Sequence, residues 1–238
     1  MGAKKAKRQN IGGNTNNVVR INNYLPKKIR TVTLLPKTTN QEQYILTLLD
    51  ENTNICFGIG PAGTGKACQS AVEHFFEGQV DKIVVTRPAV STDEDLGHLP
   101  GTLEQKMAPW TRPIFDVLRE YFYANEIESM ISEGVIEISP LAYMRGRTFK
   151  NSYIIADEMQ NATTNQMKML LTRIGSNSKM VVTGDLAQTD RLKDNGLVDF
   201  IKQLKNYKSN FIGVVDFHKG DIERHPVVKE VLEVYGDN

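Results

Sequence analysis

The stretch Gly60-Pro61-Ala62-Gly63-Thr64-Gly65-Lys66-Ala67 decides the fold class of this chain. It matches the phosphate-binding loop pattern G-x-x-x-x-G-K-[ST] at every required position except the last. Glycines let successive backbone amides turn toward a polyphosphate, and the helix that follows adds the partial positive charge of its N-terminus. Lys66 adds a mobile full charge for the outer phosphates. We therefore expect residues 60–67 to bind a nucleoside polyphosphate.

The exception is Ala67, which stands where the pattern requires serine or threonine. In the usual loop that hydroxyl binds the Mg²⁺ that bridges the β- and γ-phosphates. A methyl group has no lone pair to offer a metal. The sequence therefore leaves two outcomes open, which are hydrolysis with the metal held by other groups, and nucleotide binding with weak or absent hydrolysis.

The segments around the loop predict an α/β fold. The apolar run 55–59 before the loop is typical of a buried strand, and 67–77 after it is typical of a helix, which is the order that the pattern requires. An ordinary glycine-rich turn is the competing interpretation. Apolar strands alternating with helices predict a mostly parallel sheet with helices on both faces. The other expected strands are 30–35, 82–86, 135–139, 153–156, 179–183 and 211–216, and the other expected helices are 43–49, 103–123 (interrupted at Pro109 and Pro113), 164–174, 197–204 and 227–234.

Polar residues follow two more of these apolar strands. Asp157 and Glu158 end the strand 153–156, at the edge where open α/β sheets bind ligands. Asp157 is suited to holding Mg²⁺, directly or through water, and Glu158 to polarising the attacking water. Asp185 and Gln188 follow the strand 179–183 and are suited to sensing the γ-phosphate through water. An acidic strand end and a polar turn without function are the competing interpretations.

Composition sets further limits. The chain has 238 residues, 40% of them hydrophobic and 24% charged, and a net charge of +1, which is ordinary for a globular protein. Nine basic residues precede the first acidic residue, Glu42. We expect residues 1–35 to form a basic, flexible arm and residues 36–238 one domain. No apolar run approaches the ~20 residues that span a bilayer, and Cys56 and Cys68 suggest no disulfide framework. These features predict a cytoplasmic protein without a membrane partner.

Several segments together resemble the PhoH family of phosphate-loop ATPases. They lie, in the order of that family, at residues 58–66, 86–90, 96–101, 140–148, 157–161, 166–169, 183–188 and 224–226. The resemblance covers about residues 36 to 235. It departs from the family pattern at Ala67, where the family has threonine, and in the acidic stretch 93–95.

The resemblance implies a RecA-like P-loop ATPase domain, related to the first motor domain of superfamily-1 helicases, that uses ATP and Mg²⁺. It also implies RNA or single-stranded nucleic acid as a partner, and a homo-oligomer that can be a hexameric ring. Gln41 is similar to the glutamine that recognises adenine. Arg87, Arg145 and Arg147 match positions suited to contacting nucleic acid, and Arg224 matches a candidate arginine finger reaching a neighbouring subunit.

Three functions therefore compete. The leading hypothesis is a helicase-like ATPase acting on RNA or single-stranded nucleic acid, with a catalytic set of Lys66, Asp157, Glu158, Gln188 and Arg224. The alternative is a nucleotide-binding assembly or regulatory protein in which Ala67 weakens or abolishes hydrolysis. A small-molecule kinase is less favoured, because the acidic strand end and the Asp-x-x-Gln turn are more typical of hydrolysis.

Overall fold

The computed structural model describes residues 31–61, 64–88, 103–189 and 193–221, together with Val227 and Val234. Its strands are β1 (Ile55–Ile59), β2 (Lys82–Thr86), β3 (Ile136–Ile138), β4 (Ser152–Ala156), β5 (Lys179–Gly184) and β6 (Ile212–Asp216). Its helices are α1 (Thr39–Leu49), α2 (Thr64–Phe76), α3 (Leu103–Tyr121), α4 (Ala124–Ser132), α5 (Thr164–Leu171) and α6 (Gly196–Leu204). None of these described helices has the length and apolar character needed to cross a membrane.

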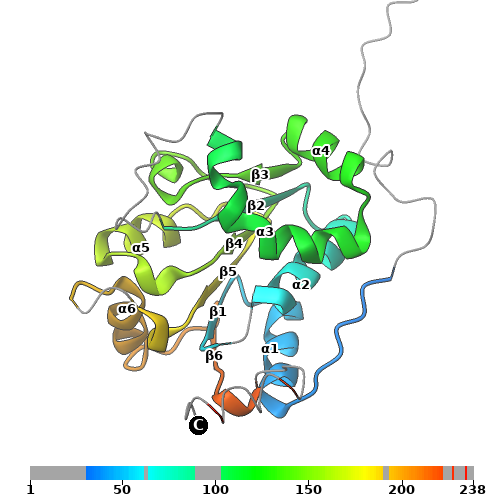
Figure 1. Cartoon of the computed structure of the whole chain (residues 1–238). Helices are drawn as coiled ribbons and strands as arrows, with labels where there is room; N and C mark the ends of the chain where they lie inside the picture. The colour runs from blue at the N-terminus through cyan, green and yellow to red at the C-terminus, as the bar shows by residue number, and fades with distance from the viewer. Residues whose placement is uncertain are drawn as a thin grey trace, which may run out of the picture.

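The six strands form one sheet in the order β3-β2-β4-β5-β1-β6, and every pair of neighbours is parallel. Figure 1 shows α1, α2 and α3 against one face of this sheet and α5 and α6 against the other. The prediction of a parallel sheet with helices on both faces is confirmed.

Alternation along the strands builds two separate cores. In β1, Cys56 packs toward α1 to α4, whereas Phe57 packs toward α5 and α6. The same division holds in β4, where Ile155 faces the first core and Ile154 the second. Successive side chains of a strand point to opposite faces, so a strand covered on both sides must be apolar throughout. This is why the strands of this chain have continuous apolar sequences.

The strand order places the ends of three strands together. Because all strands are parallel, their carboxyl ends lie at one edge of the sheet. β5 lies between β1 and β4, with Gly184 in register with Ile59, and Val182 in register with Ala156. The phosphate loop, the acidic strand end and the turn after β5 therefore share this edge.

The elements differ from the predicted ones in several places. α3 runs through Pro109 and Pro113 without interruption, and its later turns are anchored by the buried side chains of Ile114 and Leu118. Packing of this kind offsets the hydrogen bonds that proline removes from a helix. α2 begins at Thr64, three residues earlier than predicted, and α4 was not predicted at all.

At the two ends of the chain, one expected element is contradicted and the others are not tested. The described part of the expected strand 30–35 forms no strand and joins none of the six strands of the sheet, although its partly buried Val32 packs against the first core. The expected helix 227–234 lies outside the described residues except for its first and last residue. Residues 1–30 also lie outside them, so the flexible arm and the domain boundary remain predictions.

Gly60 is the glycine on which the local fold depends most, and we expect Gly60→Ala to lower the free energy of unfolding. Its φ is +125°, and an added Cβ would lie 2.4 Å from the carbonyl oxygen of Phe217. Backbone strain alone costs about 1–3 kcal/mol at such a position. Gly65→Ala is the matched control, because a Cβ there meets nothing within 4 Å and alanine favours a helix. Urea unfolding of both variants checks this, and equal stabilities would contradict it.

Candidate functional site

The start of the phosphate loop is fixed to two neighbouring strands. The Gly60 amide donates to the Gly184 carbonyl at 2.8 Å, and the Phe217 amide donates to the Ile59 carbonyl at 2.7 Å. These bonds hold the turn at the point where β1 ends. Pro61 follows and is half-buried, while Ala62 and Gly63 lie outside the described residues.

The end of the loop forms the first turn of α2, which contains Thr64, Gly65, Lys66 and Ala67. The Lys66 ammonium donates to the Leu35 carbonyl at 2.9 Å and contacts the Gln69 amide oxygen at 3.4 Å. Partial burial, with a smaller contribution from the nearby Lys37 charge, lowers the pKa of Lys66. In this conformation Lys66 is held by the segment that precedes α1, so its side chain must rotate to reach a bound phosphate.

Asp157 is the most constrained carboxylate of the site. Its side chain is almost fully buried, and its Oδ1 accepts hydrogen bonds from the Thr64 hydroxyl at 2.8 Å and the Thr183 hydroxyl at 2.6 Å. Its backbone amide donates to the Thr86 carbonyl at 2.9 Å. Within the described part of the chain, Oδ2 accepts no hydrogen bond. One oxygen is thus fixed by the protein, and the other is available to a cation or its water.

Glu158 sits in a strained position beside Asp157. Its backbone is in the left-handed region, with φ 54° and ψ 35°, which is uncommon for a residue other than glycine. Its Oε2 accepts from the Gln160 amide at 2.7 Å, and its Oε1 lies 3.6 Å from the Arg87 guanidinium. Strain of this kind clusters at functional sites, where the surroundings hold the residue in place.

Gln160 belongs to this site although the sequence reasoning assigned it no role. It is fully buried, and its Oε1 accepts from the Asp185 amide at 3.2 Å while its Nε2 donates to Glu158. Gln160 therefore connects the carboxylate after β4 to the turn after β5. The only sequence feature that could have indicated this role is the position of Gln160, two residues after Glu158.

The turn after β5 orients Gln188. Asp185 caps the short helix η4 (Leu186–Gln188), because its Oδ1 accepts from the Ala187 backbone amide at 3.0 Å. Its Oδ2 accepts from the side-chain amide of Gln188 at 2.7 Å.

The ends of the three strands meet at a cavity of about 90 Å³. It is lined by Gly60, Pro61, Thr64, Asp157, Glu158, Thr183, Gly184, Asp185 and Gln188. Small-molecule pockets usually exceed ~300 Å³, so this cavity suits the phosphate end of a nucleotide and its metal.

Gln41 lies in the first turn of α1 rather than before that helix. Its Oε1 accepts from the Lys37 amide at 2.9 Å, and its Nε2 donates to the Asp221 carbonyl at 3.0 Å. A glutamine amide has two acceptor sites and two N–H groups, so one of each remains for a base edge. Gln41 is absent from the lining of the 90 Å³ cavity, and its role with adenine remains a prediction.

The three candidate arginines that the structure describes lie in different surroundings. Arg87 lies beside Glu158, and Arg145 is exposed. Arg147 pairs through both terminal nitrogens with Glu137 of β3 and lies 4.5 Å from the centre of the Phe149 ring. This pairing lowers the pKa of Glu137 and raises the pKa of Arg147. Arg147 thus has a structural role where it lies, while Arg224 lies outside the described residues.

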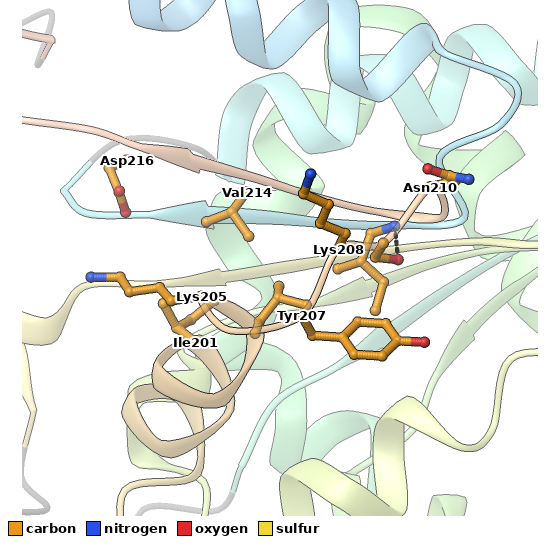
Figure 2. Close-up of a pocket in the computed structure, with 10 residues that line it drawn as sticks. Ile201, Lys205, Tyr207, Lys208, Asn210, Val214 and Asp216 are labelled. Atoms are coloured by element: carbon orange, nitrogen blue, oxygen red, sulfur yellow. Dashed lines mark hydrogen bonds between the residues drawn. The ribbon is translucent and has the colours of Figure 1, made fainter.

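A second, larger cavity lies at the open edge of the sheet beside β6. Its volume is about 530 Å³, and Figure 2 shows Ile201, Tyr207 and Val214 among the residues along it. Its lining runs from the end of α6 to Asp216 and contains none of the residues that line the smaller cavity. The candidate site is therefore the smaller cavity, which the start of the phosphate loop, Asp157 and Glu158 line.

The strand order and the glycine loop leading into α2 define an α/β protein with a RecA-like P-loop fold. Within that class the chain belongs to the family of PhoH-like proteins, whose family model matches residues 33–236. It is 42% identical over 216 residues to a PhoH-like protein of Bacillus subtilis (strain 168), covering 89% of this chain and 66% of that protein. The resemblance inferred from the sequence motifs is confirmed.

Other relatives give the same picture. The chain is 44% identical over 214 residues to a PhoH-like protein of Mycobacterium tuberculosis (strain ATCC 25618 / H37Rv), covering 87% of this chain and 59% of that protein. It is 38% identical over 212 residues to Protein PhoH of Escherichia coli (strain K12), covering 86% of this chain and 59% of that protein. The chain thus spans about 59% to 66% of the length of these three relatives.

Proposed function

We propose that this chain binds ATP with Mg²⁺ at the 90 Å³ cavity and hydrolyses it, as a helicase-like ATPase acting on RNA or single-stranded nucleic acid. The observation that carries the proposal is the meeting of three segments far apart in sequence. The phosphate loop, the Asp157–Glu158 strand end and the Asp185–Gln188 turn all line one small cavity. Such a set provides phosphate binding, metal binding and water activation within one site.

Each group has a distinct task in this proposal. Backbone amides of the loop and the rotated Lys66 side chain bind the phosphates. The donor set around Asp157, one carboxylate with hydroxyls beside it, fits Mg²⁺, which is usually bound by one or two carboxylates together with substrate phosphates. When bound, Mg²⁺ neutralises the charge that develops on the phosphates. Glu158 accepts the proton of the attacking water, and Gln188 orients that water.

Arg87 links the proposed nucleic-acid contact to hydrolysis. Its guanidinium is 3.6 Å from Glu158 Oε1, which is an ion-pair distance longer than a good hydrogen bond. A nucleic-acid phosphate that draws Arg87 toward itself changes the surroundings of the proton acceptor. We therefore expect RNA to alter the rate of ATP turnover, with exposed Arg145 and the basic residues before Glu42 as further contacts.

Oligomerisation is a further part of this proposal. Superfamily-1 motors close a cleft between two RecA-like domains, and the described residues contain one such sheet. In this proposal a neighbouring copy of the chain completes the cleft. The copies form a homo-oligomeric ring, such as a hexamer, and Arg224 of one copy reaches the nucleotide of the next. Ring symmetry gives each subunit the same neighbour and therefore the same completed site.

A second candidate function is a nucleotide-binding assembly with weak or absent hydrolysis. The observation that favours it is Ala67, whose methyl group is fully buried and supplies no oxygen to the site. Loss of even an outer partner of a metal site costs about 10–100-fold in affinity or activity.

Phosphate release from ATP by the purified full chain distinguishes the two functions. We expect release that requires Mg²⁺, rises with single-stranded RNA, and loses the RNA effect at high salt, because phosphate contacts are sensitive to counterions. ATP binding without release, with or without RNA, would favour the non-hydrolysing assembly. Failure to bind ATP would contradict both candidates.

A further inference from the structure

The hydroxyl that this loop lacks at position 67 has a counterpart one helical turn earlier. Residues three apart in a helix lie on the same face, so Thr64 stands directly before Ala67 along α2. Thr64 donates its hydroxyl hydrogen bond to Asp157 at 2.8 Å, across 93 positions of sequence. The contact joins the phosphate-loop helix to the acidic end of β4.

The hydrogen-bond count at Asp157 shows what this contact leaves free. An ionised carboxylate only accepts, so both threonine hydroxyls use their single proton on Oδ1. The lone pairs of Thr64 Oγ1 then remain for a cation or for a water bound to it. Asp157 Oδ2 likewise accepts no hydrogen bond from the described residues. Thr64 and Asp157 thus present two oxygens to the same cavity.

We propose that Thr64 is the residue that positions Mg²⁺ in this chain, taking over the task that a hydroxyl at position 67 performs in the usual loop. Thr64 holds the Asp157 carboxylate in one orientation and offers its own oxygen toward the metal or its water shell. Thr183 holds the same Oδ1 from β5 and supports the arrangement from the other side. This inference rests on the proposed function, since the metal concerned is the one that accompanies the nucleotide.

The burial of Ala67 supports this assignment. Ala67 is fully buried and belongs to the apolar core that packs against α1 to α4, whereas Thr64 is half-buried and lines the cavity. In the conformation described, Thr64 and not Ala67 is thus the residue that brings a side chain from this face of α2 to the cavity. The two positions together place a polar group in the cavity while keeping the next turn of α2 apolar.

The test is a titration of Mn²⁺, a spectroscopic substitute for Mg²⁺, into the full chain saturated with a non-hydrolysable ATP analogue, followed by electron paramagnetic resonance. We expect Thr64→Val to weaken Mn²⁺ binding by about 10–100-fold, while Thr64→Ser keeps it close to the unaltered chain. Affinity for the analogue in EDTA should change much less than the Mn²⁺ affinity. Thr64→Ala serves as a second truncation if the valine variant does not fold.

Adding Ala67→Thr to the same series measures the exchange of roles. We expect this substitution to restore Mn²⁺ affinity in the Thr64→Val background and to change it little when Thr64 is present. Equal Mn²⁺ affinity of Thr64→Val and the unaltered chain, or an equal loss in Thr64→Ser and Thr64→Val, would overturn the inference and leave the proposed function standing. Absence of analogue binding in the unaltered chain would overturn both.

Discussion

Glu158→Gln is expected to keep ATP binding and to lower ATP turnover by about 10²–10⁴-fold, the usual contribution of a positioned general base. The glutamine has nearly the same shape, so it fills the same space beside the cavity, but its amide is not a base. The left-handed backbone and the hydrogen bond from Gln160 hold this side chain in place before any ligand binds. Single-turnover phosphate release, measured beside equilibrium binding of the ATP analogue, separates the two effects.

Glu137→Gln is the matched control for that variant. Glu137 lies on β3 and pairs with Lys82 and Arg147, outside the lining of the cavity. Its replacement removes a carboxylate of the same kind from an ion-pair cluster, and we expect RNA-free turnover to be little changed. A Glu158→Gln protein with the turnover of this control would assign water activation to another residue.

Lys66→Ala is expected to produce the largest loss of nucleotide affinity. An ammonium hydrogen-bonded to phosphate contributes more than a neutral contact, and about 1.5–3 kcal/mol is typical of hydrogen bonds to charged groups. Part of that gain is offset because Lys66 must leave the Leu35 carbonyl. Calorimetric titration of the ATP analogue measures the loss, which corresponds to about 10–100-fold in affinity.

The control for the lysine variant is Lys82→Ala. Lys82 is the first residue of β2 and pairs with Glu137, so it lies at the opposite edge of the sheet from the strand ends that line the cavity. We expect its removal to leave affinity for the analogue nearly unchanged. Equal affinities for the Lys66→Ala protein and the unaltered chain would rule out the assignment of the phosphate site.

Much of this fold could be predicted because its strands are buried on both faces. For the apolar runs Ile55–Ile59 and Lys82–Thr86, the predicted first and last residues of the strand are the same as in the structure. α3 was harder, because local propensity argues against Pro109 and Pro113 inside a helix whereas tertiary packing maintains it. α4 is a short helix whose N-cap residue is Tyr123, which is unusual at that position and makes no side-chain cap hydrogen bond; instead the Glu126 carboxylate accepts from the Tyr123 backbone amide at 2.6 Å.

The candidate site could be predicted at the level of strand ends but not of contacts. Parallel strands bring their carboxyl ends to one edge of the sheet. Asp157 and the turn at Asp185 could therefore be placed near the phosphate loop, because each directly follows an apolar strand in the sequence. No sequence pattern indicates that Thr64 donates to Asp157, or that Lys66 contacts Leu35. The pairing of Arg147 with Glu137 could not be predicted either, because Glu137 is ten positions away and lies in a different element.

The central claim is that ATP binds at the edge where β1, β4 and β5 end. The most direct test is calorimetric titration of a non-hydrolysable ATP analogue into the full chain in Mg²⁺, repeated with Lys66→Ala. We expect saturable binding at a single site per chain and a large loss of affinity in the variant. No binding by the unaltered chain, or binding that the variant retains in full, would contradict it.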